Sequence, residues 1–188
     1  MDISNNEIFD LVDKYGHSGP FIKSISYNNG IIKSDKGYHK YISSYHKIFG
    51  WTEPTRNALD EMVKFIKNES VLEIGTGVGL VTKLLSNNGI DITAVDNYKK
   101  KVRTFYDIEI MDHKKALSKY DKDVLLLVFP SINKHCFESL KLFKGDKLIL
   151  IGEKLSELEF GGMHCDKDFF KMVERNWTIK KVVKMRKV

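Results

Sequence analysis

The chain has 188 residues, of which 42% are hydrophobic and 30% charged, and its formal net charge is +6, with 27 lysines but only four arginines. This is the balance of an ordinary globular domain, and it excludes a disordered chain. The longest apolar runs are too short to span a bilayer, and the N-terminus MDISNNEIFD lacks the pattern of a signal peptide, so we expect a cytoplasmic protein and no membrane partner. The two cysteines, Cys136 and Cys165, form no CxxC pair and predict free thiols. The basic excess alone is weak support for a nucleic-acid partner.

Residues 1–50 differ in composition from the rest and predict an N-terminal extension. NEIFDLVDKY is typical of a short amphipathic helix. Asn29-Gly30 lies between two short apolar stretches, which predicts a β-hairpin. The segment that follows is aromatic, with Tyr38, Tyr41, Tyr45, His46, Phe49 and Trp51.

Residues 51–188 alternate between helical and strand patterns. A helix is expected to begin near Pro54, with Thr52 as its cap. Strand patterns then occur at SVLEIG, IDITAVD, YDIEIMD, VLLLVF and DKLILIG, with helical patterns between them, and WTIKKVVKM reads as a last strand. Strands that alternate with helices predict an α/β fold, a doubly wound and mostly parallel sheet with helices on both faces.

The first strand of this domain leads into VLEIGTGVGL, residues 71–80, where three glycines occupy alternate positions. In a doubly wound sheet this turn comes closest to the ligand, and we expect its backbone amides to face it. The spacing is not the G-x-G-x-x-G of nicotinamide-binding proteins, because the sixth position is Leu80. Asp96 ends the next strand, where an acid can bind both hydroxyls of a ribose. The alternatives are a tight turn without a ligand and an aspartate that caps a helix.

These residues resemble the class I S-adenosylmethionine-dependent methyltransferases over roughly residues 52–188. EIGTGVG matches the family's first motif, an acid followed by Gly-x-Gly-x-Gly, and AVD at 94–96 matches the second. The resemblance implies a Rossmann-like methyltransferase fold and S-adenosylmethionine as cofactor. It also implies an adenine-side acid at Asp112. Independently of the resemblance, the aromatic residues near the end of residues 1–50 predict that this extension covers the cofactor, because aromatic rings can enclose a sulfonium. The alternative for the aromatic segment is packing against the sheet. The implied cofactor-binding residues are Glu73, Gly75, Thr76, Gly77, Gly79, Asp96, Asp112 and Phe129.

The acceptor is expected near the end of the fourth strand, at Phe129-Pro130-Ser131. Enzymes that methylate exocyclic amines of bases carry Asp/Asn-Pro-Pro-aromatic there, so the sequence does not support that activity. FGWTEPTRNALDEM and the stretch around Phe129 also resemble a little-characterised methyltransferase-like group that tends to have Trp-Pro-Pro at this point. Phe129 either stacks on an acceptor, closes the cofactor pocket or belongs to the core.

No catalytic residue follows from the pattern, and no set of acids indicates a metal site. His135 and Cys136 are candidates for the pocket rim, with a helix-face histidine and a buried thiol as the plain alternative. Glu153 and His164 lie in later loops. Lys99, Lys100 and Lys101 follow Asp96 closely, so they border the expected cofactor site and are candidates to attract phosphate; the alternative is a solvated helix face. Two functions follow: a methyltransferase with an unidentified acceptor, or a cofactor-binding but inactive relative that acts by binding a protein or nucleic acid.

Overall fold

A five-stranded parallel sheet forms the centre of the molecule. The computed structural model describes residues 3–15, 26–28, 31–33, 46–98, 103–131, 133–152 and 165–183. The strands are β3 (Val71–Ile74), β4 (Ile92–Asp96), β5 (Glu109–Ile110), β6 (Val124–Val128) and β7 (Lys147–Ile151). They lie in the order β5-β4-β3-β6-β7, and every neighbouring pair is parallel. This confirms the predicted α/β class and its Rossmann-like sheet.

The order of the strands shows where the sheet opens a crevice. The chain runs outward from β3 through β4 to β5 and then returns to place β6 on the other side of β3. The switch point therefore lies between β3 and β6. Loops that leave the carboxyl ends of these two strands diverge, which opens a crevice there.

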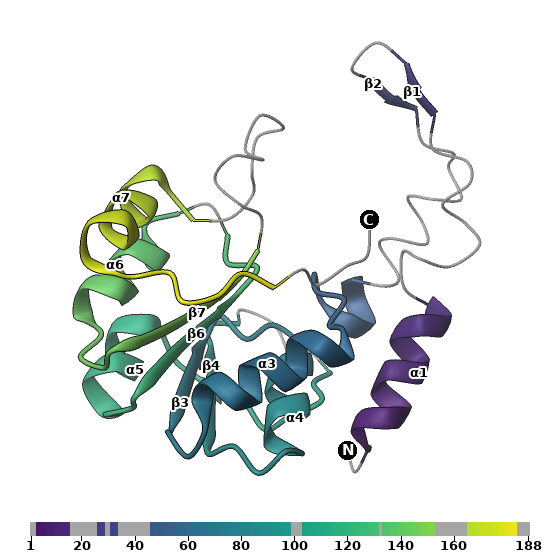
Figure 1. Ribbon diagram of the computed structural model, residues 1–188, viewed down its shortest axis with the longest axis horizontal. Helices are drawn as coiled ribbons and strands as arrows, with labels where there is room; N and C mark the ends of the chain where they lie inside the picture. The colour runs from purple at the N-terminus through teal and green to yellow at the C-terminus, as the bar shows by residue number, and fades with distance from the viewer. Residues whose placement is uncertain are drawn as a thin grey trace.

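Helices cover both faces of the sheet (Figure 1). On one face lie α1 (Asn5–Tyr15), α3 (Arg56–Ile66) and α4 (Leu80–Ser86); on the other lie α5 (His113–Lys119), α6 (His135–Leu142) and α7 (Lys167–Asn176). Alternate residues of the central strands enter the two cores: Val71 packs with the first group and Leu72 with the second. All four residues of β3 are buried, as expected of a strand covered on both faces.

Helix α1 is part of the main core. Ile8, Phe9 and Val12 are buried in the same cluster as residues of α3 and α4. Asn5 Nδ2 also donates to Leu84 O at 3.3 Å. The described part of the predicted extension thus joins this core through α1 and through Phe49, and its role as a cofactor cover stays a prediction.

The predicted hairpin is present, with β1 (Ser26–Asn28) antiparallel to β2 (Ile31–Lys33) and Asn28 opposite Ile31. The predicted cap of α3 was wrong. Thr55, not Thr52, caps this helix, and its side chain accepts from Ala58 N–H at 3.2 Å. Thr52 is instead buried.

The predicted last strand was also wrong over the residues described, because 177–183 form no strand. Ile179 and Val182 are 72% and 61% exposed, so their side chains supply no burial that would hold the segment on the sheet. Lys181 instead pairs with Glu61 of α3. Among the described residues, no helix combines the length and apolar character needed to cross a membrane.

Candidate cofactor-binding site

A cavity of about 300 Å³ opens at the carboxyl ends of β3, β4 and β6. It lies at the switch point, where doubly wound sheets bind their ligands. Of the residues predicted for the site, those that line it are Glu73, Gly75, Thr76, Gly77, Asp96 and Phe129. Gly79 caps α4 just behind the cavity wall.

The glycine turn needs glycine for its backbone conformation. Gly75, Gly77 and Gly79 have φ of 72°, 59° and 73°, the left-handed region that other residues rarely adopt. A Cβ added to Gly75 or Gly77 would meet nothing within 4 Å, whereas one on Gly79 would lie 3.2 Å from Tyr106 Cβ. Gly75 and Gly77 therefore leave open space on the cavity side, and Gly79 permits close packing behind it.

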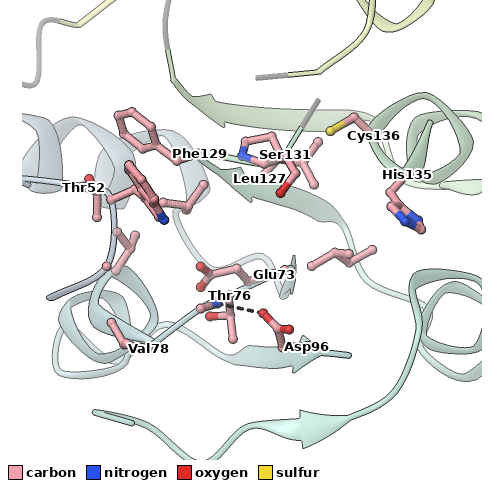
Figure 2. A pocket seen from close by; sticks show the side chains of 18 of the residues that line it. Thr52, Glu73, Thr76, Val78, Asp96, Leu127, Phe129, Ser131, His135 and Cys136 are labelled. Carbon is pink, nitrogen blue, oxygen red and sulfur yellow. Dashed lines mark hydrogen bonds between the residues drawn. The ribbon is translucent and has the colours of Figure 1, made fainter. Parts of the chain in front are cut away.

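Contrary to the expectation that the amides of this turn face the cavity, the first three of them donate to β4. Gly75 N–H and Thr76 N–H both donate to Val95 O, at 2.9 and 3.3 Å. Gly77 N–H donates to Asp96 Oδ2 at 2.9 Å (Figure 2). The turn is thus fastened to the end of β4, and what it offers a ligand is mainly the space left by absent side chains.

Asp96 ends β4 and lines the cavity. Burial raises the pKa of its carboxyl, although hydrogen bonds from the Gly77 and Asn97 amides act in the opposite direction. These amides hold the carboxylate in one orientation. An oriented acid at the end of the second strand of a doubly wound sheet is suited to ribose hydroxyls.

Glu73 is a buried acid whose hydrogen bonding is incomplete. Its side chain is 1% exposed, and its Oε2 accepts a hydrogen bond from Thr82 Oγ1. Thr82 Oγ1 lies 2.8 Å from Thr76 Oγ1, so both hydroxyls support the carboxyl group. Glu73 Oε1 is buried and has no hydrogen-bond partner among the described residues. Burial raises the pKa of Glu73 to about 7, with a smaller contribution from the charge of Asp96. A cationic ligand in the cavity would satisfy this carboxyl.

Phe129 follows β6 with an unusual backbone. Its φ is 42°, which is strained for a bulky residue, and its N–H donates to Ile151 O at 2.8 Å. The residue both lines the cavity and packs against the core, so two of its predicted roles are compatible. In Figure 2, Phe129 and Thr52 lie at one end of the cavity and Asp96 and His135 toward the other, with Glu73 and Thr76 between.

Asp112 occupies a different environment from the one expected. It is exposed and caps α5, and its Oδ1 accepts from Lys114 N–H and Lys115 N–H at 2.9 and 3.0 Å. Its neighbours Met111 and His113 line the cavity, but Asp112 itself does not. Its predicted role beside adenine stays a prediction.

The aromatic segment contributes its last residues. Phe49, Gly50, Trp51 and Thr52 line the cavity, and the Trp51 ring, 58% exposed, contacts the His46 ring at 3.9 Å between centroids. The other residues predicted from this segment and from later loops lie outside the described residues: Tyr38, Tyr41, Tyr45, Lys99, Lys100, Lys101, Glu153 and His164.

The structure brings together three residues, His113, His135 and Glu138, that the sequence analysis did not predict as a cluster. His113 Nε2 lies 2.9 Å from Glu138 Oε2, and His113 Nδ1 lies 3.1 Å from His135 Nδ1. His113 is buried, and both histidines line the cavity. The two histidines are the first residues of α5 and α6, which follow parallel strands and so begin at the same edge of the sheet. This position, at the start of helices that follow parallel strands, is the feature of the sequence from which the cluster could have been predicted.

The same cluster groups three side chains that can each ligate a metal ion. Lys114 Nζ lies 3.1 Å from Glu138 Oε2, so an ammonium already occupies one side of the carboxylate. Cys136 lines the cavity beside His135 and is buried with Cys165 in one apolar cluster; both thiols are free.

Comparison with known proteins gives a family. The model of the family described as "Tellurite resistance protein TehB" matches residues 38–130, which include the glycine turn, Asp96 and Phe129. No curated protein matches the chain. The TehB family consists of methyltransferases of the class I fold, and the parallel sheet agrees with it. The chain therefore belongs to the class I S-adenosylmethionine-dependent methyltransferase superfamily.

Proposed function

We propose that this protein binds S-adenosylmethionine in the cavity and transfers its methyl group to an acceptor at the Phe129 end. The observation that carries the proposal is the convergence of three features on one cavity: open space at Gly75 and Gly77, the oriented carboxylate of Asp96, and the unpartnered oxygen of Glu73. Each feature suits a different aspect of the cofactor: the open space admits it close to the backbone, Asp96 suits the ribose hydroxyls, and Glu73 suits the positively charged end.

The residues that line the cavity favour one orientation of the bound cofactor. S-adenosylmethionine carries its positive charges on the sulfonium and the ammonium, and its adenosine end is uncharged. Glu73 lies between Asp96 and Phe129 (Figure 2), so the charged end would extend from the ribose at Asp96 toward Phe129. Phe129 and Trp51 offer aromatic surface to a cation there. The adenine would then lie on the other side of Asp96.

The chain's contribution to transfer is positioning. When bound, the cofactor supplies an electrophilic methyl group on sulfur, and the displacement needs an acceptor atom held in line with it. Phe129, Pro130 and Ser131 form the wall at the carboxyl end of β6, where the acceptor would be held.

The proposal is tested first by calorimetry with S-adenosylmethionine, S-adenosylhomocysteine and NAD. We expect the first two to bind and NAD not to bind. Gly77→Ala should abolish or strongly weaken binding, because its methyl group would enter the open space. Gly89→Ala is the matched control: Gly89 also has positive φ, 80°, and a Cβ there also meets nothing within 4 Å, but it lies outside the cavity. Equal binding by both variants would contradict the site.

Methyl transfer is tested separately with labelled cofactor on metabolites, protein, RNA and DNA. Transfer to any of them supports the proposal. Tight cofactor binding without transfer in all four classes would favour the inactive, partner-binding alternative.

A further inference from the structure

We propose that the His113–His135–Glu138 cluster is the adenine-reading subsite of the cavity, and that it prefers adenine because His135 presents a hydrogen-bond acceptor to the exocyclic amine. This inference rests on the proposed function, since it assumes that the cofactor binds in the direction set out above.

Position is the first argument. His113 and His135 line the cavity, and in Figure 2 His135 lies on the Asp96 side, away from Phe129 and Thr52. With the ribose at Asp96 and the charged end toward Phe129, the base occupies this end. Met111 and Cys136 line the same cavity and provide apolar surface for a planar ring.

The hydrogen bonds of the cluster indicate which ring nitrogen of each histidine carries a proton. Lys114 and His113 both contact Glu138, and they hold the pKa of its carboxyl below the ordinary value. An ionised carboxylate only accepts, so His113 Nε2 must carry the proton that it donates across 2.9 Å. In a neutral imidazole the other nitrogen is then bare, so His113 Nδ1 accepts.

The same reasoning applies to the second ring. His113 Nδ1 lies 3.1 Å from His135 Nδ1; with both rings neutral, His135 donates from Nδ1, and its Nε2 carries the free lone pair. Among the described residues no hydrogen bond engages this Nε2. His135 is exposed and lines the cavity, so the acceptor is accessible to a ligand there.

An acceptor at this place distinguishes two purines. Adenine presents an amino group at C6, whereas hypoxanthine presents a carbonyl oxygen, which would meet the lone pair of His135 without a proton between them. A site built to bind a donor rejects an analogue that lacks it, because a polar group is then left unpaired. The expected preference for the adenine ligand is roughly 10- to 100-fold in Kd.

The test compares S-adenosylhomocysteine with S-inosylhomocysteine by calorimetry at pH 7.5, on the full chain. The unaltered protein should bind the adenosyl ligand more tightly by the factor above. His135→Ala should bring the two dissociation constants within about twofold of each other, mainly by weakening the adenosyl ligand. Lys134→Ala is the matched control: Lys134 is the exposed neighbour that does not line the cavity, and its loss should leave the preference unchanged.

Glu138→Gln tests the proton chain without changing a group that faces the base. An amide can donate as well as accept, so His113 is no longer forced to carry its proton on Nε2, and the preference should shrink although His135 is intact. A merely structural role of Glu138 would weaken both ligands equally and leave their ratio unchanged, which would overturn the proposal.

The outcomes separate this inference from the proposed function. Tight binding of both ligands without preference overturns the inference and leaves the proposed function standing. Absence of binding by either ligand contradicts the proposed function, and the inference with it. Zn²⁺ binding that requires His113, His135 and Glu138 and excludes S-adenosylhomocysteine would assign the cluster to a metal and also overturn the inference.

Discussion

Protonation of Glu73 should control cofactor affinity. Burial raises the pKa of this carboxyl from 4.5 to about 7, so close to half of it is protonated at pH 7. The cationic cofactor favours the carboxylate, so affinity should rise with pH through this range and level off above it. Simple linkage with a pKa of about 7 gives roughly a tenfold weaker Kd at pH 6 than at pH 8. Near pH 7, binding should release about half a proton per cofactor.

The assay is calorimetry with S-adenosylmethionine at several pH values, in buffers of different ionisation enthalpy. Glu73→Gln should remove the protein's contribution to the pH dependence. Glu53→Gln is the matched control: burial raises the pKa of Glu53 to about 7 as well, but Glu53 does not line the cavity. Thr82→Val removes a hydrogen bond that lowers the pKa of Glu73, so it should move the midpoint above 7. The ligand's own amine titrates identically in every variant. A profile that survives Glu73→Gln, or one that disappears in Glu53→Gln, would refute the reasoning.

Two further predictions concern the same acids. Asp96→Ala should weaken S-adenosylmethionine roughly 10- to 100-fold by losing charge-assisted bonds to the ribose. Asp91→Ala is the control and should leave this affinity unchanged, because Asp91 is exposed, precedes the same strand and pairs with Lys122. Equal losses of affinity in both variants would remove Asp96 from the site. Glu73→Gln should also stabilise the protein by up to about 3 kcal/mol at pH 8 and by no more than about 1 kcal/mol at pH 5. The sign follows from the raised pKa: the folded protein holds a proton between pH 4.5 and 7 that the unfolded chain releases, so its stability falls as pH rises through this window. Urea denaturation at both pH values measures this, and a stabilisation of equal size at pH 5 would contradict it.

Local sequence patterns predicted most of the sheet because each element is specified by its own residues. The run from Val124 to Val128 is apolar at every position and forms β6, a strand buried on both faces. The acid at the end of β4 and the glycines after β3 lie in one cavity because parallel strands bring their carboxyl ends together. The fold and the position of the cavity could therefore be predicted without tertiary information.

Features that depend on distant partners could not be predicted in this way. WTIKKVVKM has the composition of a strand, but pairing requires a free edge and an apolar surface to cover, and Ile179 and Val182 remain exposed. The choice between Thr52 and Thr55 as helix cap depends on where the chain turns into α3. In the structure the turn comes at Thr55, and Thr52 lies before it in the lining of the cavity. The histidine cluster joins residues 22 and 25 positions apart, and only the adjacency of α5 and α6 brings them together.

The end of the cavity opposite the histidines is shaped by strain at Phe129. A bulky residue with φ of 42° costs about 1–3 kcal/mol, and such strain persists only where the surrounding structure enforces it. Here the enforcement is visible in the fold, because β6 pairs with β7 through Val128 and Ile151, and the Phe129 N–H continues this ladder to Ile151 O. The backbone at Phe129 is therefore set by the sheet and does not depend on a ligand. A family member with Asn or Asp at this point would present a polar group to hold an amine, whereas Phe129 presents only an aromatic surface. We therefore expect the acceptor to be held by shape and by contact with the ring, and exocyclic base amines to be poor acceptors.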